Sequence, residues 1–191
     1  MGRWEPGARD RIADAALELF TEGGFAATTV PQITARAGLT TRTFFRHFAD
    51  KRDVLFADED EIPLAITGLL AVAPLSTPTI EVIGGGLRGL VSDYEPRRDQ
   101  LRARLLIIQS DDSLRERYLR KLSVMSAAMV AGFRQRGTDG RVADVAAKIG
   151  STLFGFAYDR WLATGETRSL SELIDETLDL FGSEFAASTA T

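Results

Sequence analysis

The chain has 191 residues, of which 45% are hydrophobic, and carries a formal net charge of −4. This hydrophobic content excludes a disordered polypeptide and suffices for one large packed domain or two small ones. Without cysteine the sequence cannot form a disulfide scaffold or a thiolate metal site, and its single histidine, His47, argues against a zinc centre or a serine-type triad. We therefore expect no enzymatic activity, no catalytic residues, no metal and no cofactor.

Charge is distributed unevenly along the chain. Residues 1–52 hold eight Lys and Arg against six Asp and Glu, a balance of +2, whereas residues 53–191 hold fifteen against twenty-one, a balance of −6. Because phosphate contacts depend on which face carries the cations, the acidic average does not exclude a nucleic-acid partner.

No segment is typical of secretion or of a membrane span. The first twenty residues lack an apolar stretch before a small-residue cleavage site. The most apolar window, Leu64–Leu75, is interrupted by Thr67 and Gly68 and is too short to cross a bilayer. We expect a cytoplasmic protein that does not contact a membrane.

Three short helices are predicted near the N-terminus. The first covers about residues 8–22, where apolar side chains recur at helical spacing and two glycines follow. Thr29 is a candidate N-cap for the second helix, which Gly38 ends. Thr40 can cap a third helix that runs to about residue 48.

The remainder also has a helical pattern, interrupted by proline, glycine and Asp-Asp breaks. The breaks delimit candidate helices near residues 53–72, 79–94, 97–110, 113–136, 141–164 and 170–187. No convincing period-two strand and no internal repeat is found. The predicted fold is all-α, with an N-terminal three-helix domain over residues 1–52 and a larger helical domain over residues 53–191.

The third helix has two distinct faces. At about 100° per residue, Phe44 and Phe48 share one face, while Arg42 and Arg46 lie on the opposite one with Thr43 beside them. Planar guanidinium donors match both phosphate and the major-groove edge of guanine, and threonine is short enough for close approach. On an isolated helix the two cations would be only a solvated face, but this helix follows another by a short glycine-containing turn, as in a helix-turn-helix.

The stretch TTVPQITARAGLTTRTFFRHFADKRDVLF, residues 28–56, resembles the N-terminal signature of the tetracycline-repressor-like (TetR) family of transcriptional regulators. The resemblance covers roughly residues 8–56 and includes several elements at fixed mutual spacing. It implies that a set of residues on and beside the third helix approaches DNA: Thr41, Arg42, Thr43, Phe45, Arg46 and His47. It also implies that Thr29 and Lys51, at helix starts, bind backbone phosphate.

Two of these residues have alternative roles. Phe45 stands where the family more often has an aromatic hydroxyl, so its ring could pack on a sugar or thymine methyl, or complete the core. His47 lies near the edge of the apolar stripe and is equally consistent with a packing histidine.

The segment GGGLRG, residues 84–89, formally satisfies the G-x-G-x-x-G dinucleotide pattern. That pattern binds a pyrophosphate only after a strand in a βαβ unit, and no alternating strands follow. We expect a helix loosened by small residues instead.

Two stripes of large apolar residues in the C-terminal part have two possible roles. They could be ordinary core, or they could line a pocket for a small, largely apolar effector with a few polar groups. The candidates are Met125, Met129, Phe133, Phe154, Tyr158 and Trp161, with Gln109 as a further polar group.

The apolar faces of the last two helices include small residues that allow close helix approach. The family resemblance implies that these helices pair with their copies in a homodimer. The leading hypothesis is a ligand-responsive DNA-binding regulator, a repressor that binds a pseudo-palindromic double-stranded operator as a homodimer. The alternative is a helical small-molecule binding protein or enzyme whose N-terminal unit only packs or contacts a partner.

Overall fold

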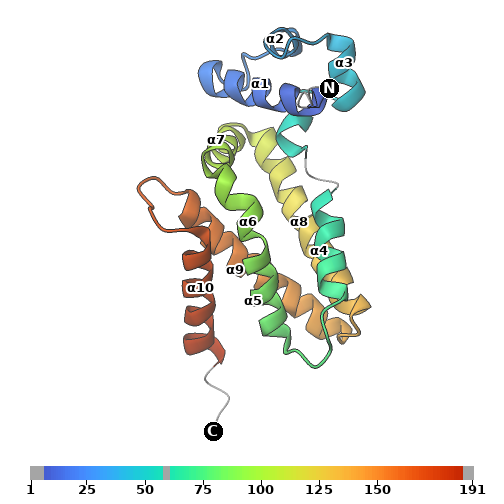
Figure 1. Ribbon diagram of the computed structural model, residues 1–191, viewed down its shortest axis with the longest axis vertical. Coiled ribbons are helices and arrows are strands. Elements are labelled where there is room, and N and C mark those ends of the chain that lie inside the picture. Colours follow the sequence, from blue (N-terminus) through green and yellow to red (C-terminus); the bar gives the residue numbers. More distant parts are fainter. Residues whose placement is uncertain (1–6, 58–60, 187–191) are drawn as a thin grey trace, which may run out of the picture. The chain divides into compact units, whose positions relative to one another are not determined.

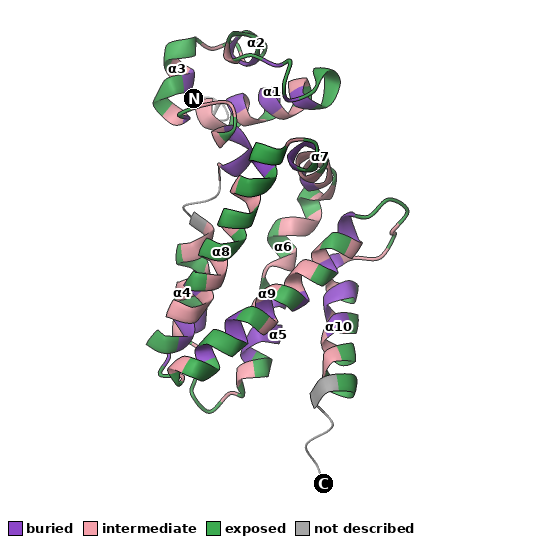
Figure 2. Ribbon diagram, turned by 180° about the vertical axis from the view of Figure 1, so that it is seen from behind, coloured by how far each residue is buried: buried purple, intermediate pink, exposed green. Residues whose placement is uncertain are grey.

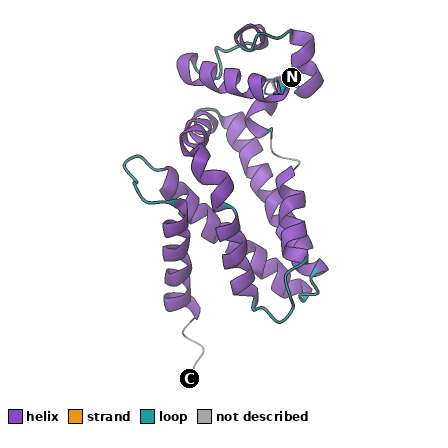
Figure 3. Cartoon of the chain, in the orientation of Figure 1, coloured by secondary structure: helices purple, strands orange, loops and turns teal. Residues whose placement is uncertain are grey.

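A computed structural model describes residues 7–57 and 61–186 of the chain. Throughout these ranges the regular elements are helices joined by turns and loops, and no strand occurs (Figure 1, Figure 3). The predicted all-α class is confirmed. Among the described helices, none has both the length and the apolarity needed to cross a membrane.

The chain divides into two compact units, which are described separately below. The first comprises residues 1–59 and 102–119, and the second comprises residues 60–101 and 120–191. The segment 102–119, assigned from the sequence to the C-terminal domain, therefore lies in the same unit as the N-terminal helices. The sequence boundary at residues 52/53 stays a prediction.

The first unit begins with α1 (Ala8–Gly23), α2 (Val30–Arg36) and α3 (Thr41–His47), followed by a 3₁₀ turn, η1 (Asp53–Phe56). Gly24 ends α1 with a φ of 84°, a left-handed conformation that glycine adopts without a Cβ penalty. Its amide donates to the carbonyl of Phe20 at 3.0 Å.

The core of the first unit is built around aromatic and β-branched side chains. Ile12, Ile33 and Phe44 have no solvent exposure, and the rings of Phe20 and Phe25 meet edge to face. Side chains from the 102–119 segment join the same core, namely Ile107, Ile108 and Leu114. Because their partners are remote in sequence, this segment could not be assigned to the N-terminal unit from local pattern alone.

The remaining helices are α4 (Glu61–Ala71), α5 (Thr79–Gly89), α6 (Val91–Tyr94), α7 (Arg98–Gln109), α8 (Asp112–Gln135), α9 (Gly140–Leu162) and α10 (Leu170–Phe181). A 3₁₀ turn, η2 (Glu95–Arg97), precedes α7, and a π-helical turn, η3 (Gly182–Ala186), follows α10.

Two helix predictions need correction. The helix expected over 53–72 begins as the 3₁₀ turn η1, and the α-helix starts only at Glu61. The helix expected over 79–94 is divided between α5 and α6. The GGGLRG segment lies inside α5, which follows no strand, so it has none of the context of a dinucleotide site.

Small residues allow α9 to pack closely in the second unit. Ala143, Ala146 and Ala147 are buried on one side of α9, while other parts of the helix are exposed (Figure 2). A Cβ at Gly150 would lie only 2.5 Å from the terminal methyl of Met129, on α8. Substitution of Gly150 would therefore require the Met129 side chain to move.

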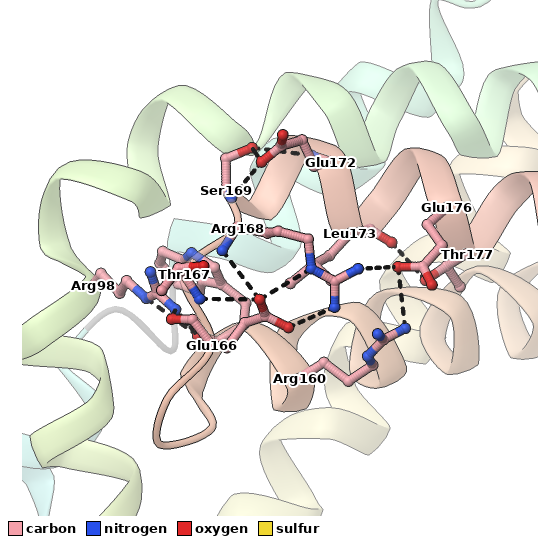
Figure 4. A network of polar contacts seen from close by, with 11 residues as sticks. Arg98, Arg160, Glu166, Thr167, Arg168, Ser169, Glu172, Leu173, Glu176 and Thr177 are labelled. Atoms are coloured by element: carbon pink, nitrogen blue, oxygen red, sulfur yellow. Dashed lines mark hydrogen bonds and ion pairs between the residues drawn. The ribbon is translucent and has the colours of Figure 1, made fainter.

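Polar contacts fix the loop between α9 and α10 (Figure 4). Ser169 and Glu172 form a reciprocal capping box at the start of α10, which satisfies backbone donors there. Hydrogen bonds from Arg168 lower the pKa of Glu166 from 4.5 to about 2. Arg98 donates to the carbonyls of Trp161 and Glu166, each at 2.6 Å from Nη2.

Candidate nucleic-acid interface

Helix α3 forms because its first turn is capped and its middle is anchored. Thr40 adopts an extended conformation, and its hydroxyl accepts a hydrogen bond from the Thr43 amide at 3.1 Å. Phe44 is fully buried and Phe48 is 4% exposed, with ring centroids 5.6 Å apart. The buried aromatic pair fixes which side of α3 faces outward.

The outward side carries most of the predicted DNA-contacting residues. Thr41, Arg42 and Arg46 are exposed, and Thr43 is half-buried. Phe45 is 59% exposed although its ring touches Phe44 edge to face at 5.4 Å. The structure thus leaves most of the Phe45 ring on the surface.

Two of the side chains near the end of α3 contact each other. Arg46 donates from Nη2 to Nε2 of His47 at 3.3 Å, and His47 is half-buried. Arg42 has no hydrogen-bond or ion-pair partner among residues 7–57 and 61–186. Its guanidinium is therefore available to an external acceptor without first breaking a contact within the chain.

The turn between α2 and α3 depends on glycine. Gly38 has a φ of 66°, which a residue with a Cβ rarely adopts. The Leu39 amide donates to the carbonyl of Thr34 at 2.8 Å, which closes the turn. The two helices are therefore joined by a compact, hydrogen-bonded connection, as a helix-turn-helix requires.

Helix α2 is tied to α1 by charge and capped at its own start. Arg36 donates to Glu18 at 3.0 Å and to Glu22 at 2.8 Å. The hydrogen bond from Arg36 lowers the pKa of Glu22. Thr29, predicted to bind phosphate, caps α2 in a reciprocal capping box with Gln32.

Lys51, also predicted to bind phosphate, points its ammonium group at the chain itself. Nζ lies within hydrogen-bonding distance of three backbone carbonyls in the loop between α1 and α2. No local sequence signal identifies this contact, because donor and acceptors are more than twenty residues apart. The phosphate role of Lys51 stays a prediction.

An ion pair that the sequence did not indicate lies just after α3. Asp53 accepts a hydrogen bond from the Ala49 amide at 2.7 Å and also pairs with Arg117. The Arg117 guanidinium carbon lies 4.8 Å from the centroid of the Phe56 ring. A residue of the 102–119 segment thus helps to fix the chain directly after α3.

The candidate effector residues are distributed over both units. Gln109 is exposed and belongs to the first unit, whereas the other six belong to the second. Phe133 and Trp161 are almost fully buried, and the Ser151 hydroxyl lies 3.5 Å from the Met129 sulfur. Met125 on α8 is half-buried.

Three of these residues form an aromatic cluster with one that the sequence analysis missed. The ring of Phe154 stacks on Tyr158 with centroids 5.4 Å apart, and Trp161 lies 6.0 Å from Tyr158. Tyr94 meets Phe154 and Tyr158 edge to face at 5.7 and 5.8 Å. Because Tyr94 lies in a separate short helix, its place in this cluster has no local sequence signal.

The part of the chain that the structure describes holds no group of three or more His, Asp and Glu side chains placed to bind a metal. The clustered functional groups of α3 are instead hydrogen-bond donors, which suit phosphate and base edges.

Residues 12–57 match the family described as bacterial regulatory proteins, tetR family. This match covers the helices whose geometry is given above, including the capped recognition helix. The N-terminal helices of the chain therefore form a TetR-family DNA-binding domain. This domain, together with the relatives described next, supports a DNA-binding regulator and not an enzyme.

Relatives extend the similarity beyond the N-terminal region. The transcriptional regulator MftR of Mycobacterium tuberculosis is 28% identical, with 95% of this chain and 93% of the relative covered. The transcriptional repressor AcnR of Corynebacterium glutamicum is 25% identical over 91% of this chain and 89% of its own.

A solved structure shares the fold. It is the triclosan complex of SmeT, the repressor of the Stenotrophomonas maltophilia multidrug efflux pump SmeDEF. It aligns with a TM-score of 0.61 at 22% identity, covering 92% of this chain and 90% of SmeT. The common architecture of the TetR fold therefore includes both units of this chain.

Proposed function

We propose that this TetR-family regulator is a homodimeric repressor that binds a pseudo-palindromic operator and releases it when a small apolar effector binds. The observation that carries the proposal is the division of α3 into a buried face, centred on Phe44, and an exposed face with Arg42 and Arg46. Two such helices in a symmetric dimer would enter successive major grooves, about 34–36 Å apart. A regulator of bacterial DNA would act in the cytoplasm.

Individual residues have distinct proposed roles in DNA binding. Arg42 and Arg46 donate to base edges or phosphates, and the short side chains of Thr41 and Thr43 permit close approach. The exposed ring of Phe45 contacts sugar or a thymine methyl group. His47 contacts Arg46 and would orient its guanidinium, while Thr29, at the start of α2, would bind the phosphate backbone.

The proposed dimer surface is an exposed apolar stripe on α9. Val142 is 47% exposed, Val145 56% and Phe156 48%, at a spacing that places them on one side of the helix. Leu180 on α10, the helix that packs with α9, is 49% exposed. Such a stripe needs cover in water, and a second copy provides identical apolar surface.

The proposed effector site includes the aromatic cluster of the second unit. The rings of Phe154, Tyr158 and Trp161 supply apolar surface, and the hydroxyl of Tyr158 and the sulfur of Met129 supply polar or polarizable contacts. The triclosan complex of SmeT shows a fold relative holding a small aromatic molecule. The effector would act by binding more tightly to the conformation that does not fit the operator. A preference of about 4 kcal/mol changes the ratio of the two conformations by roughly a thousandfold.

The experiment that tests the proposal is a salt-titrated mobility-shift assay with a duplex selected by the wild-type chain from random-sequence DNA. Specific binding should weaken steeply as salt rises, because cations on the protein displace counterions from phosphate. The Arg46→Ala variant should lose about 1–3 kcal/mol and tolerate more bases at one operator position. A wild-type chain that retains no duplex at low salt would refute the proposal.

A further inference from the structure

The ammonium group of Lys51 is saturated by contacts within the chain. Lys51 is half-buried, and its Nζ lies 4.4 Å from the centroid of the Phe25 ring in the loop between α1 and α2. It donates to three backbone carbonyls: Phe25 at 2.7 Å, Ala26 at 3.2 Å and Thr28 at 2.9 Å. A lysine ammonium has three protons to donate, so none remains for a further acceptor.

These contacts join two points that flank the helix-turn-helix. The acceptors precede α2, and Lys51 follows α3, so the bridge closes residues 29–50 into a ring. Hydrogen bonds from a charged donor are roughly twice as strong as neutral ones. The bridge therefore restricts how far α2 and α3, as a pair, can rotate relative to the α1 loop.

The accepting loop is otherwise well ordered by its own hydrogen bonds. The Thr28 hydroxyl, which has one proton, donates to the carbonyl of Gly24 at 2.9 Å, and its oxygen also lies 3.3 Å from the carbonyl oxygen of Leu19. Lys51 thus connects the end of α3 to a segment that is itself fixed to α1. If Nζ moved out to a phosphate, three carbonyls would lose their donor at once.

We propose that Lys51 is a positioning residue, which staples the two ends of the helix-turn-helix together and thereby sets the orientation of α3, and that its side chain does not neutralise a DNA phosphate. This inference rests on the proposed DNA-binding function. It assigns Lys51 a role different from the one that the family resemblance implied.

Salt dependence separates the two roles. A side chain that neutralises one phosphate contributes about 0.9 to the slope of log affinity against log salt, so its removal lowers the slope by that amount. A positioning residue alters the affinity at every salt concentration without changing the number of neutralised phosphates. Its removal therefore lowers the affinity and leaves the slope unchanged.

The test uses Lys51→Met, which keeps an unbranched side chain one atom shorter and removes its donors. Binding to the selected duplex should weaken by roughly tenfold at each salt concentration, with an unchanged slope. Without DNA, amide hydrogen exchange should accelerate at Thr29 and Gln32, which form the capping box directly after the stapled loop. Amides in the middle of α1 should be unaffected.

Lys51→Gln serves as the second variant, because it has no charge but retains two donors. Lys51→Gln should bind DNA more tightly than Lys51→Met and should keep the wild-type slope of log affinity against log salt. Its slope tests the inference even if Lys51→Met does not fold. Arg52→Met is the matched control, since it removes the neighbouring cation, whose guanidinium bonds Asp50. Exchange at Thr29 should not change in this control.

A slope lower by about 0.9 in both Lys51 variants would overturn the inference and assign the side chain to phosphate. Unchanged affinity and unchanged amide exchange in Lys51→Met would overturn it as well. Failure of the wild-type chain to bind any duplex would instead refute the proposed function. The exchange measurements would still test whether the Lys51 contacts order the start of α2.

Discussion

The exposed faces of α3 and α9 differ in what they reveal about a partner. On α3 the exposed side chains include two guanidinium groups and a hydroxyl, supplied by Arg42, Arg46 and Thr41. On α9 the exposed stripe is apolar and includes Val145 and Phe156. Directional donors at fixed spacing restrict the partner to acceptors with matching geometry, whereas apolar surface is compatible with a second copy, a ligand or another protein.

The buried faces of these helices also differ. Helix α3 depends on the ring of Phe44, which is fully buried and has a buried aromatic neighbour, Phe48, directly after the helix. Helix α9 buries small residues in its first half, Ala143, Ala146 and Ala147, and a large ring, Trp161, near its end. Removal of a buried ring should therefore destabilise either helix, whereas surface changes should affect assembly at α9 and DNA binding at α3.

The largest expected effect is that of Phe44→Ala. Removing a fully buried ring should destabilise the chain by about 3–5 kcal/mol, measured by denaturant unfolding. Phe45→Ala is the matched control, because this adjacent ring is 59% exposed and should cost less than about 1 kcal/mol while reducing DNA affinity. Equal destabilisation by both variants would contradict the assignment of the two faces.

A second prediction tests the apolar stripe on α9. Val145→Asp would place two carboxylates in the proposed symmetric interface, and it should weaken dimerisation by about 3 kcal/mol. Sedimentation analysis should then show monomer at concentrations where the wild type is dimeric. Val124→Asp, at a similarly exposed position on α8, should leave the dimer intact. If Val124→Asp dissociated the dimer and Val145→Asp did not, the dimer interface would have to be assigned to α8.

Substitutions at adjacent threonines should separate the folding of α3 from its contact with DNA. Thr40→Ala removes the N-cap acceptor for the Thr43 amide and should lower stability by about 1 kcal/mol. Thr41→Ala, one residue later and exposed, should leave stability nearly unchanged and weaken DNA binding. Thermal unfolding measures the stability of both variants, and mobility-shift titrations measure their DNA binding. A loss of stability in Thr41→Ala but not in Thr40→Ala would contradict the assignment of Thr40 as the cap and Thr41 as the DNA contact.

The smallest expected effect concerns Glu166 in the loop before α10. Because Arg168 lowers its pKa from 4.5 to about 2, Glu166 stabilises the fold above about pH 4.5, and this contribution is lost as the pH falls towards 2. Glu166→Gln should therefore reduce the Tm slightly at pH 7, less so at high salt, and not at pH 2. The control is Glu81→Gln, which removes an exposed carboxylate on α5 instead. A Tm difference between wild type and Glu166→Gln that persisted at pH 2 would contradict this explanation.

Much of the first unit could be predicted from sequence because its determinants are local. The caps at Thr29 and Thr40, the glycine turn at Gly38 and the spacing of the phenylalanines each act within a few residues. The contacts of Lys51 and Arg117 could not be predicted, since their partners lie more than twenty residues away in sequence. Long-range contacts depend on how helices pack, which a single pattern does not specify.

The second unit was harder to predict because apolar periodicity does not identify the neighbour of a stripe. Phe154, Tyr158 and Trp161 were correctly grouped by spacing, but their contact with Tyr94 depends on the path of a separate short helix. The placement of residues 102–119 with the N-terminal unit depends on burial of Ile107 and Ile108 in a shared core. These features arise from tertiary packing.

The central claim is that the exposed side of α3 reads double-stranded DNA. Methylation interference on the selected duplex, with wild type and the Arg42→Ala and Arg46→Ala variants compared, tests it most directly. We expect methylation of guanine N7 to block wild-type binding in two patches about one helical turn apart, and each variant to lose its sensitivity at particular guanines. Identical interference patterns for wild type and both variants would contradict the claim.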